Sequence, residues 1–250
     1  MKIGSFNIAL LATGLLVSTL TSAMQADRRG LSLSQTRVVF NAAAPSISVA
    51  LRNHSASPWL VRAQVLTSPD GAQAAPFMVT PPLFRLEPDS QSTVRILRQG
   101  TETLPADRES VFYLSFLAIP SSRKLDADMS ASISAQVTVG VDTVIKLFHR
   151  PAGLALTPQA AAEKLTVRLQ GDGVDVTNPT PYYQTLATFS LDGKPMPVRE
   201  AGSMIAPFAT RHYPHPLTSG HPREARWSVI NDYGGVSPSY QTPVSPKEVR

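Results

Sequence analysis

Short runs in which apolar residues recur at every second position fill most of this chain, and they constrain its fold more than any other feature. In the run at 47–51, Ile47, Val49 and Leu51 are each separated by one small residue. Successive side chains of a β-strand point to opposite faces, so this period of two indicates half-buried strands. The same pattern recurs at 61–66, 94–97, 111–119, 137–142, 165–169, 174–176, 189–191 and 227–230.

Clusters of Pro, Gly, Asn and Asp separate these runs, which is the arrangement expected of a β-sandwich. The alternation breaks at 150–153 and then restarts, with a hairpin signal at Asp192-Gly193. A chain of 250 residues is long enough for two domains with separate cores. We therefore predict an all-β protein with one domain at 27–150 and a second at 151–245. The Ser- and Pro-rich segment after Gly234 is expected to end in loose residues.

The first residues have the pattern of a secretory signal. Lys2 precedes an apolar run at 8–17, and small residues follow up to Ala23 and Ala26. We expect a signal peptide at 1–23, with cleavage possible as late as 26. An uncleaved anchor is the less favoured alternative, because a membrane-spanning helix needs about 20 apolar residues. No second long apolar stretch follows, so we expect no stable membrane insertion.

Charge and motifs argue against several function classes. The net charge of +5 comes from Lys and Arg that do not cluster, so nucleic-acid binding is not indicated. Cysteine is absent, which excludes disulfides and thiolate sites. The chain has no nucleophile elbow, phosphate loop or zinc-protease motif. His212, His215 and His221 could suggest a metal site, but prolines intervene and no acidic ligand has motif spacing. We expect a solvated loop there, no metal or cofactor, and no enzymatic activity.

Seven strings, in order along nearly the whole chain after the signal, resemble the periplasmic chaperones of the chaperone–usher pilus pathway. The resemblance implies two immunoglobulin-like β-sandwich domains in an L or boomerang arrangement. It also implies a cis peptide bond between Thr80 and Pro81. The strings are SQTRVVF at 34–40, TPPLFRLEP at 80–88, DRESVFY at 107–113, IKLFHRP at 145–151, NPTPYY at 178–183, SMIAPF at 203–208 and INDYG at 230–234.

The resemblance further implies a function. Such a chaperone works in the periplasm of a Gram-negative bacterium and binds pilus subunits that lack their final strand. It lends them a strand, which is donor-strand complementation, and delivers them to the outer-membrane usher. A secreted immunoglobulin-like module for adhesion or carbohydrate binding is the alternative function.

Two groups of residues would hold the subunit. Family resemblance assigns its C-terminal carboxylate to Arg37 and Lys146, since two cations in a cleft give attraction and register. Without the resemblance both would be read as ordinary exposed cations. The lent strand maps to one alternating face of the last strand of the first domain, although that face could instead pack within its own domain. Its residues are Ile133, Ala135, Val137, Val139 and Val141.

Lys146 has the opposite parity to these valines. An undistorted strand would therefore aim it at the other face, and a bulge or twist between Val141 and Lys146 would reconcile the two.

The remaining implied residues join the domains or meet the usher. An interdomain ionic network maps to Glu109, Arg150 and Asp232, which would fix the angle between the domains, unless these are three unrelated surface charges. The usher contact maps to an apolar patch on the first domain. Its residues are Pro58, Leu60 and Ile119.

Overall fold

The computed structural model describes residues 30–71, 73–100, 103–121, 139–214 and 222–246 of the chain. The expected signal peptide, the donor positions Ile133, Ala135 and Val137, and His215 and His221 lie outside these residues. The described part is almost entirely β-structure and folds into two bodies. Each body has its own buried core, and the two cores share no residue. The predicted all-β class with two immunoglobulin-like domains is confirmed. The domain limits at 27–150 and 151–245 stay a prediction.

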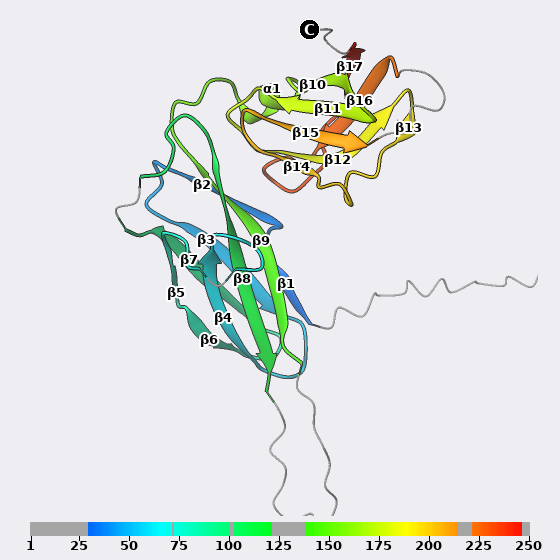
Figure 1. The fold of residues 1–250 in the computed structure, drawn as a ribbon. Coiled ribbons are helices and arrows are strands. Elements are labelled where there is room, and N and C mark those ends of the chain that lie inside the picture. Colours follow the sequence, from blue (N-terminus) through cyan, green and yellow to red (C-terminus); the bar gives the residue numbers. More distant parts are fainter. Residues whose placement is uncertain (1–29, 72, 101–102, 122–138, 215–221, 247–250) are drawn as a thin grey trace, which may run out of the picture.

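The first body packs a four-stranded sheet against a five-stranded one (Figure 1). Within each sheet the neighbouring strands are antiparallel, except that β2 runs parallel to β9. The four-stranded sheet has the order β1 (Leu31–Leu33), β3 (Ile47–Asn53), β7 (Gln91–Arg98) and β5 (Phe77–Thr80). The five-stranded sheet has the order β2 (Arg37–Asn41), β9 (Val141–Arg150), β8 (Ser110–Pro120), β4 (Trp59–Leu66) and β6 (Leu83–Leu86).

Alternation in the sequence places this core. Val49 and Leu51 in β3, and Val61 and Ala63 in β4, are buried, while the residues between them face outward. One face of each sheet therefore supplies the interior of the sandwich. The period-2 runs predicted strands here correctly because each sheet buries only one of its faces.

The second body is a single curled sheet with a short helix at one end. Trp227 is buried in its core and donates through Nε1 to the carbonyl of Ala162, at 2.9 Å, in the helix α1 (Pro158–Ala162). The side chain of Thr157 caps α1 by accepting from the amide of Ala160. The strand order is β13 (Lys194–Pro195), β12 (Gln184–Leu191), β16 (Glu224–Val229), β17 (Tyr240–Ser245), β10 (Thr166–Gln170), β11 (Gly173–Asn178) and β15 (Ala209–Pro214), with β14 (Met204–Ile205) also paired to β12.

Two local predictions are confirmed. Asp192 and Gly193 both have positive φ and connect β12 to β13, as an Asp-Gly hairpin turn requires. The peptide bond between Thr80 and Pro81 is cis. Within the described residues, no helix has the length and apolar content that a membrane crossing needs.

Figure 1 shows the second body set at an angle across one end of the first. The end concerned is where β9 finishes and β2 connects toward β3. Residues of this end therefore face the second body, and the opposite end of the β8–β9 pair points away from it.

His149 should make the stability of the first body depend on pH. Its ring stacks on Phe40 with centroids 6.2 Å apart, and its buried Nδ1 has no hydrogen-bond partner among the described residues. Burial, and then the charge of Arg98, lower its pKa. The unfolded chain therefore binds this proton more readily, and stability is lost as pH falls below the unfolded value of about 6.5. Urea unfolding from neutral to mildly acidic pH should show this loss, and His149→Phe should flatten the slope; equal slopes would contradict the assignment.

Candidate functional site

An ion-paired cluster joins the two bodies. The guanidinium of Arg150, at the end of β9, bonds through Nε to Glu109 Oε1 at 2.7 Å. Its two terminal nitrogens bond the carboxylate of Asp232, from the second body, at 2.7 and 2.8 Å. The structure thus brings together the three residues assigned to an interdomain network; they are not unrelated surface charges.

Because the cluster is buried, each of its charged groups needs a bonded partner. The Glu109 side chain is 2% exposed and that of Arg150 15%, so both depend on partners. The second oxygen of Glu109 accepts from the amide of Tyr183 at 2.8 Å, and the Glu109 amide donates to the carbonyl of Pro181. Burial alone would lower the pKa of Arg150, but the bonds and charges of Asp232 and Glu109 raise it well above its ordinary value. Arg150 therefore remains a cation, and the carboxylates of Glu109 and Asp232 are its partners.

The loop that carries Asp232 is held against the first body. Asn231 accepts, through Oδ1, from the amides of Tyr233 and Gly235, each at 3.0 Å. Gly234 has a φ of 83°, and a Cβ placed there would lie 2.3 Å from the hydroxyl of Thr36. The positive φ favours glycine at this position, and any larger residue would also have to displace the Thr36 hydroxyl of the first body.

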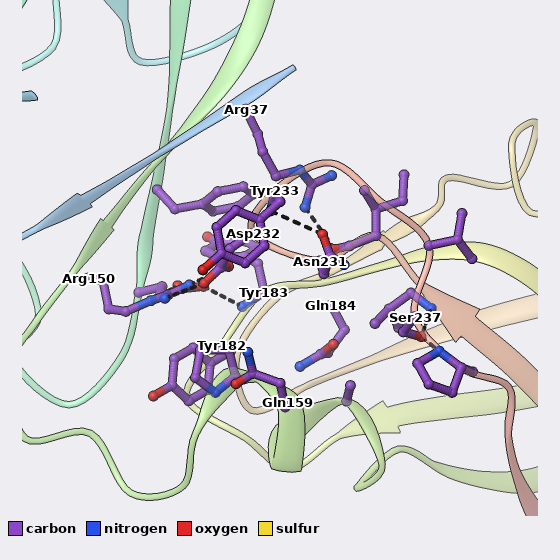
Figure 2. A pocket seen from close by; sticks show the side chains of 18 of the residues that line it. Arg37, Arg150, Gln159, Tyr182, Tyr183, Gln184, Asn231, Asp232, Tyr233 and Ser237 are labelled. Atoms are coloured by element: carbon purple, nitrogen blue, oxygen red, sulfur yellow. Dashed lines mark hydrogen bonds and ion pairs between the residues drawn. The ribbon is translucent and has the colours of Figure 1, made fainter. Parts of the chain in front are cut away.

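The two candidate anchor cations lie side by side next to this loop. Arg37 opens β2 and pairs in register with Lys146 of β9, so their side chains share one face of the sheet. Arg37 donates to the carbonyl of Ile230 at 2.9 Å and lies over the ring of Phe148. Figure 2 shows it at the edge of a hollow that Arg150, Asp232 and Asn231 also line. Lys146 lies beside Arg37 but outside that hollow.

The electrostatics of this pair suit an anion. Burial lowers the pKa of Lys146, and the positive charge of Arg37 lowers it further. Burial also lowers the pKa of Arg37, although Asp232 and Glu109 offset part of this. No carboxylate in the described ranges forms an ion pair with Lys146. A carboxylate arriving here would relieve the repulsion between two half-desolvated cations.

One edge of β9 has no neighbouring strand in the described structure from Val141 up to the cation pair. On one side β9 pairs with β8 from Val141 to His149, which is all of the strand except its last residue. On the other side β2 pairs only from Lys146 to Arg150, so residues 141–145 have no strand beside them in the described structure. The unpaired edge ends where the cation pair begins. Sequence patterns could not reveal this, because the length of β2 relative to β9 is a tertiary property.

The burial of the apolar residues changes along this segment, from exposed at its start to buried at its end. Leu147 is in the core and Ile145 packs against it. Val141, on the same face, is 48% exposed and Val139 is 67% exposed. The described donor positions therefore do not pack inside their own domain, whereas the continuation of the same face does.

Of the bulge or twist expected between Val141 and Lys146, the bulge is absent, because the register of β8 with β9 runs without a shift through this segment. Lys146 and the valines consequently lie on opposite faces. A strand that pairs with the open edge of β9 has side chains on both faces of the sheet. It can therefore lie beside the valines on one face and Lys146 on the other without a bulge.

The residues assigned to the usher contact form an exposed patch. Leu60 of β4 pairs in register with Ile119 of β8, and these side chains are 48% and 41% exposed. Pro58, which is partly exposed, precedes β4, and its carbonyl accepts from the amide of Ser121 at 3.0 Å. The patch lies on the outer face of the sheet that contains β9.

The structure corrects the expectation of a solvated loop at His212, because this residue lies in β15, while His215 and His221 are outside the described residues. His212 bonds Asp175 at 2.8 Å and Asp172 at 3.2 Å on the sheet surface. Within the described ranges, no group of three or more His, Asp or Glu residues has an arrangement that could hold a metal ion.

Comparison with known proteins gives a consistent result. The family model for the pili and flagellar-assembly chaperone, PapD N-terminal domain, matches residues 30–155. The model for the pili assembly chaperone PapD, C-terminal domain, matches residues 160–241. The probable fimbrial chaperone protein ElfD of Escherichia coli K12 is 36% identical, with 90% of this chain and 91% of that protein covered. The chaperone protein FimC of E. coli O6:H1 is 32% identical, with 95% and 93% covered.

Solved structures agree. The E. coli chaperone DraB superimposes with a TM-score of 0.74 and 38% identity, covering 87% of this chain and 97% of that one. A chain of the Salmonella enterica complex between the SafA pilin and the SafB chaperone superimposes with a TM-score of 0.73 and 30% identity, covering 86% of this chain and 97% of that one. These relatives are named as chaperones, which argues against the alternative of a carbohydrate-binding module.

Removing one member of the ionic cluster should be costly. Asp232→Ala leaves Arg150 partly buried with half of its partners, and we expect a loss of about 3 kcal/mol in the free energy of unfolding. Glu87→Ala is the matched control, because its pair with Arg85 is 57% and 64% exposed and should contribute at most about 1 kcal/mol. Urea denaturation measures both. Equal losses in the two variants would contradict the role assigned to the cluster.

Proposed function

The chain belongs to the pilus-assembly chaperone family, and from that membership we propose that it holds each pilus subunit at the open edge of β9 and at the pair Arg37 and Lys146. As a member of the family it is a chaperone of pilus subunits. The observation that carries the proposal is that the unpaired edge, residues 141–145, ends at the two cations.

Unpaired backbone groups at a sheet edge favour strand addition. A subunit without its final strand exposes both a groove and unpaired edge groups, and an added strand satisfies both. The segment from 139 to 145 spans about 20 Å at 3.3 Å per residue, enough for one ordinary strand. The exposed valines at 139 and 141 are suited to fill such a groove, and by the family resemblance Ile133, Ala135 and Val137 extend the same face.

The position of the cations fixes the direction of the bound strand. For a subunit's C-terminal carboxylate to reach Arg37 and Lys146, its last strand must run toward residue 146. That strand is then parallel to β9. It lies in line with β2, which pairs with the same edge and is also parallel to β9.

The rest of the proposed cycle uses other surfaces. The patch of Pro58, Leu60 and Ile119 delivers the loaded chaperone to the outer-membrane usher. The cluster of Glu109, Arg150 and Asp232 fixes the angle between the domains, with a boundary near Arg150. The chain performs this role in the Gram-negative periplasm after its signal peptide is removed, and it catalyses no reaction.

The anchor is tested by co-expression with the pilus subunit of the same gene cluster. Arg37→Ala combined with Lys146→Ala should reduce the subunit recovered with the chaperone in the osmotic-shock fraction by more than tenfold, because charge-assisted bonds to the carboxylate are lost. Arg52→Ala is the control, since Arg52 is an exposed cation on the other sheet. Unchanged recovery with the double variant would refute the anchor.

Substitutions in the donor valines and in the patch of Leu60 and Ile119 should block different steps, the first subunit capture and the second usher binding. Val139→Asp with Val141→Asp should abolish capture of the subunit, since two carboxylates would enter an apolar groove. Leu60→Asp with Ile119→Asp should leave subunit capture intact and prevent binding of the loaded chaperone to immobilised usher. Gel filtration and usher pull-down measure the two steps. If the second pair of substitutions also blocks capture, the division of the surfaces is wrong.

A further inference from the structure

A second contact between the two bodies lies outside the hollow. The guanidinium of Arg108, just before β8, lies 4.8 Å from the centre of the ring of Phe208 in the second body. Phe208 directly precedes β15, and neither residue lines the hollow beside Arg37. A cation over an aromatic ring is attracted by it, and the planar guanidinium of arginine also stacks well there. The pair therefore joins the bodies at a point that the ionic cluster does not include.

The guanidinium of Arg108 is held in place from its own side. Asp107 accepts from Arg108 Nε at 3.0 Å and from Nη2 at 2.7 Å. Such a bidentate pair fixes the plane of the guanidinium. The next residue, Glu109, is bonded by Arg150 and by the amide of Tyr183. Arg108 therefore presents one flat face from a segment that is already tied to the second body.

Phe208 has an unusual backbone conformation. Its φ is 55°, in the left-handed region that bulky residues rarely adopt. Its side chain is 49% exposed and is not part of the buried core of its own body. Such strained residues persist where the surrounding structure imposes them, and they concentrate at functional contacts. The core of the second body does not account for the position of this ring, whereas the contact with Arg108 does.

The ionic cluster by itself leaves rotation between the bodies possible. The second body crosses one end of the first (Figure 1), and domains of one chain usually move relative to one another unless a large apolar interface joins them. The hydrogen bonds of the cluster gather around Arg150, so they resist separation more than rotation about that point. A contact away from that point resists rotation. The loop of Asp232 also bonds Arg37 through the Ile230 carbonyl, so a rotation would change the surroundings of Arg37.

We propose that Arg108 and Phe208 form an interdomain latch, which limits rotation of the second body about the ionic cluster. Both are positioning residues, because they act on the site through the loop of Asp232 that bonds Arg37. The restriction of rotation does not depend on the proposed function. The effect on subunit capture rests on that function, because it places the end of the subunit at Arg37 and Lys146.

The latch is tested by measuring the distance between the bodies. The chain has no cysteine, so Thr93→Cys and Thr166→Cys place one spin label on an exposed strand position of each body. In the mature chaperone, Phe208→Ala should widen the distribution of label distances about twofold, as expected when a contact between domains is lost. Phe208→Tyr should keep the wild-type width, because the ring is retained. Arg108→Gln should also widen it, whereas the matched control Arg85→Gln, in another exposed ion pair, should not.

Two comparisons separate the contact from the stability of the fold. Phe208→Gly should unfold at higher urea than Phe208→Ala, because glycine adopts a φ of 55° without strain, yet both should widen the distribution equally. Adding Arg108→Gln to Phe208→Ala should widen it little further, as expected for two groups in contact. A wild-type width in Phe208→Ala, or a width that follows the urea midpoint, would overturn the latch.

Subunit capture tests the link between the latch and the anchor. In the co-expression assay, Phe208→Ala should lower the recovery of the subunit severalfold, but by less than the double variant of Arg37 and Lys146. Wild-type recovery together with a widened distribution would overturn this link. Loss of recovery in the double variant would leave the proposed function standing in either case.

Discussion

The interaction on which the site depends is the contact of Arg150 with two carboxylates from different bodies. Glu109 is almost fully buried and Arg150 is partly buried, so the guanidinium needs the carboxylate of Asp232 from the second body as well as that of Glu109. That requirement places the loop of Asp232 against Thr36 and brings the Ile230 carbonyl to Arg37. The hollow beside the cations therefore exists because a buried guanidinium needs its partners.

The second essential feature is a difference in strand length. β9 continues past the start of β2, so a stretch of backbone keeps one edge without a partner inside the described structure. An exposed edge with valines next to it invites unwanted pairing. Under the proposed function, another protein's incomplete sheet would be closed at this edge, and the cations would limit how far that protein can slide along it.

Much of the fold could be predicted from the sequence, since the period of two marks strands of both bodies, such as β3, β4, β8, β10 and β16. The predicted runs did not include β1, β2, β5, β6, β14, β15 and β17. In β17, Ser and Pro in 237–246 interrupt the pattern, and this strand lies between β16 and β10. The resemblance identified Glu109, Arg150 and Asp232, which the structure brings into contact. The open edge and the unshifted register to Lys146 could not be predicted, since each depends on how distant segments meet.

The parallel pairing of β2 with β9 has one further consequence. If the C-terminus of a guest strand is held at Arg37, the register of that strand against β9 is fixed. Every second residue counted back from the terminus then lies on the face that carries the valines. A guest extended by a single residue would present the opposite set of side chains there. Under the proposed anchoring, the two cations would set the register of the guest strand from its terminus, so a guest would be selected by the phase of its last strand as well as by its composition.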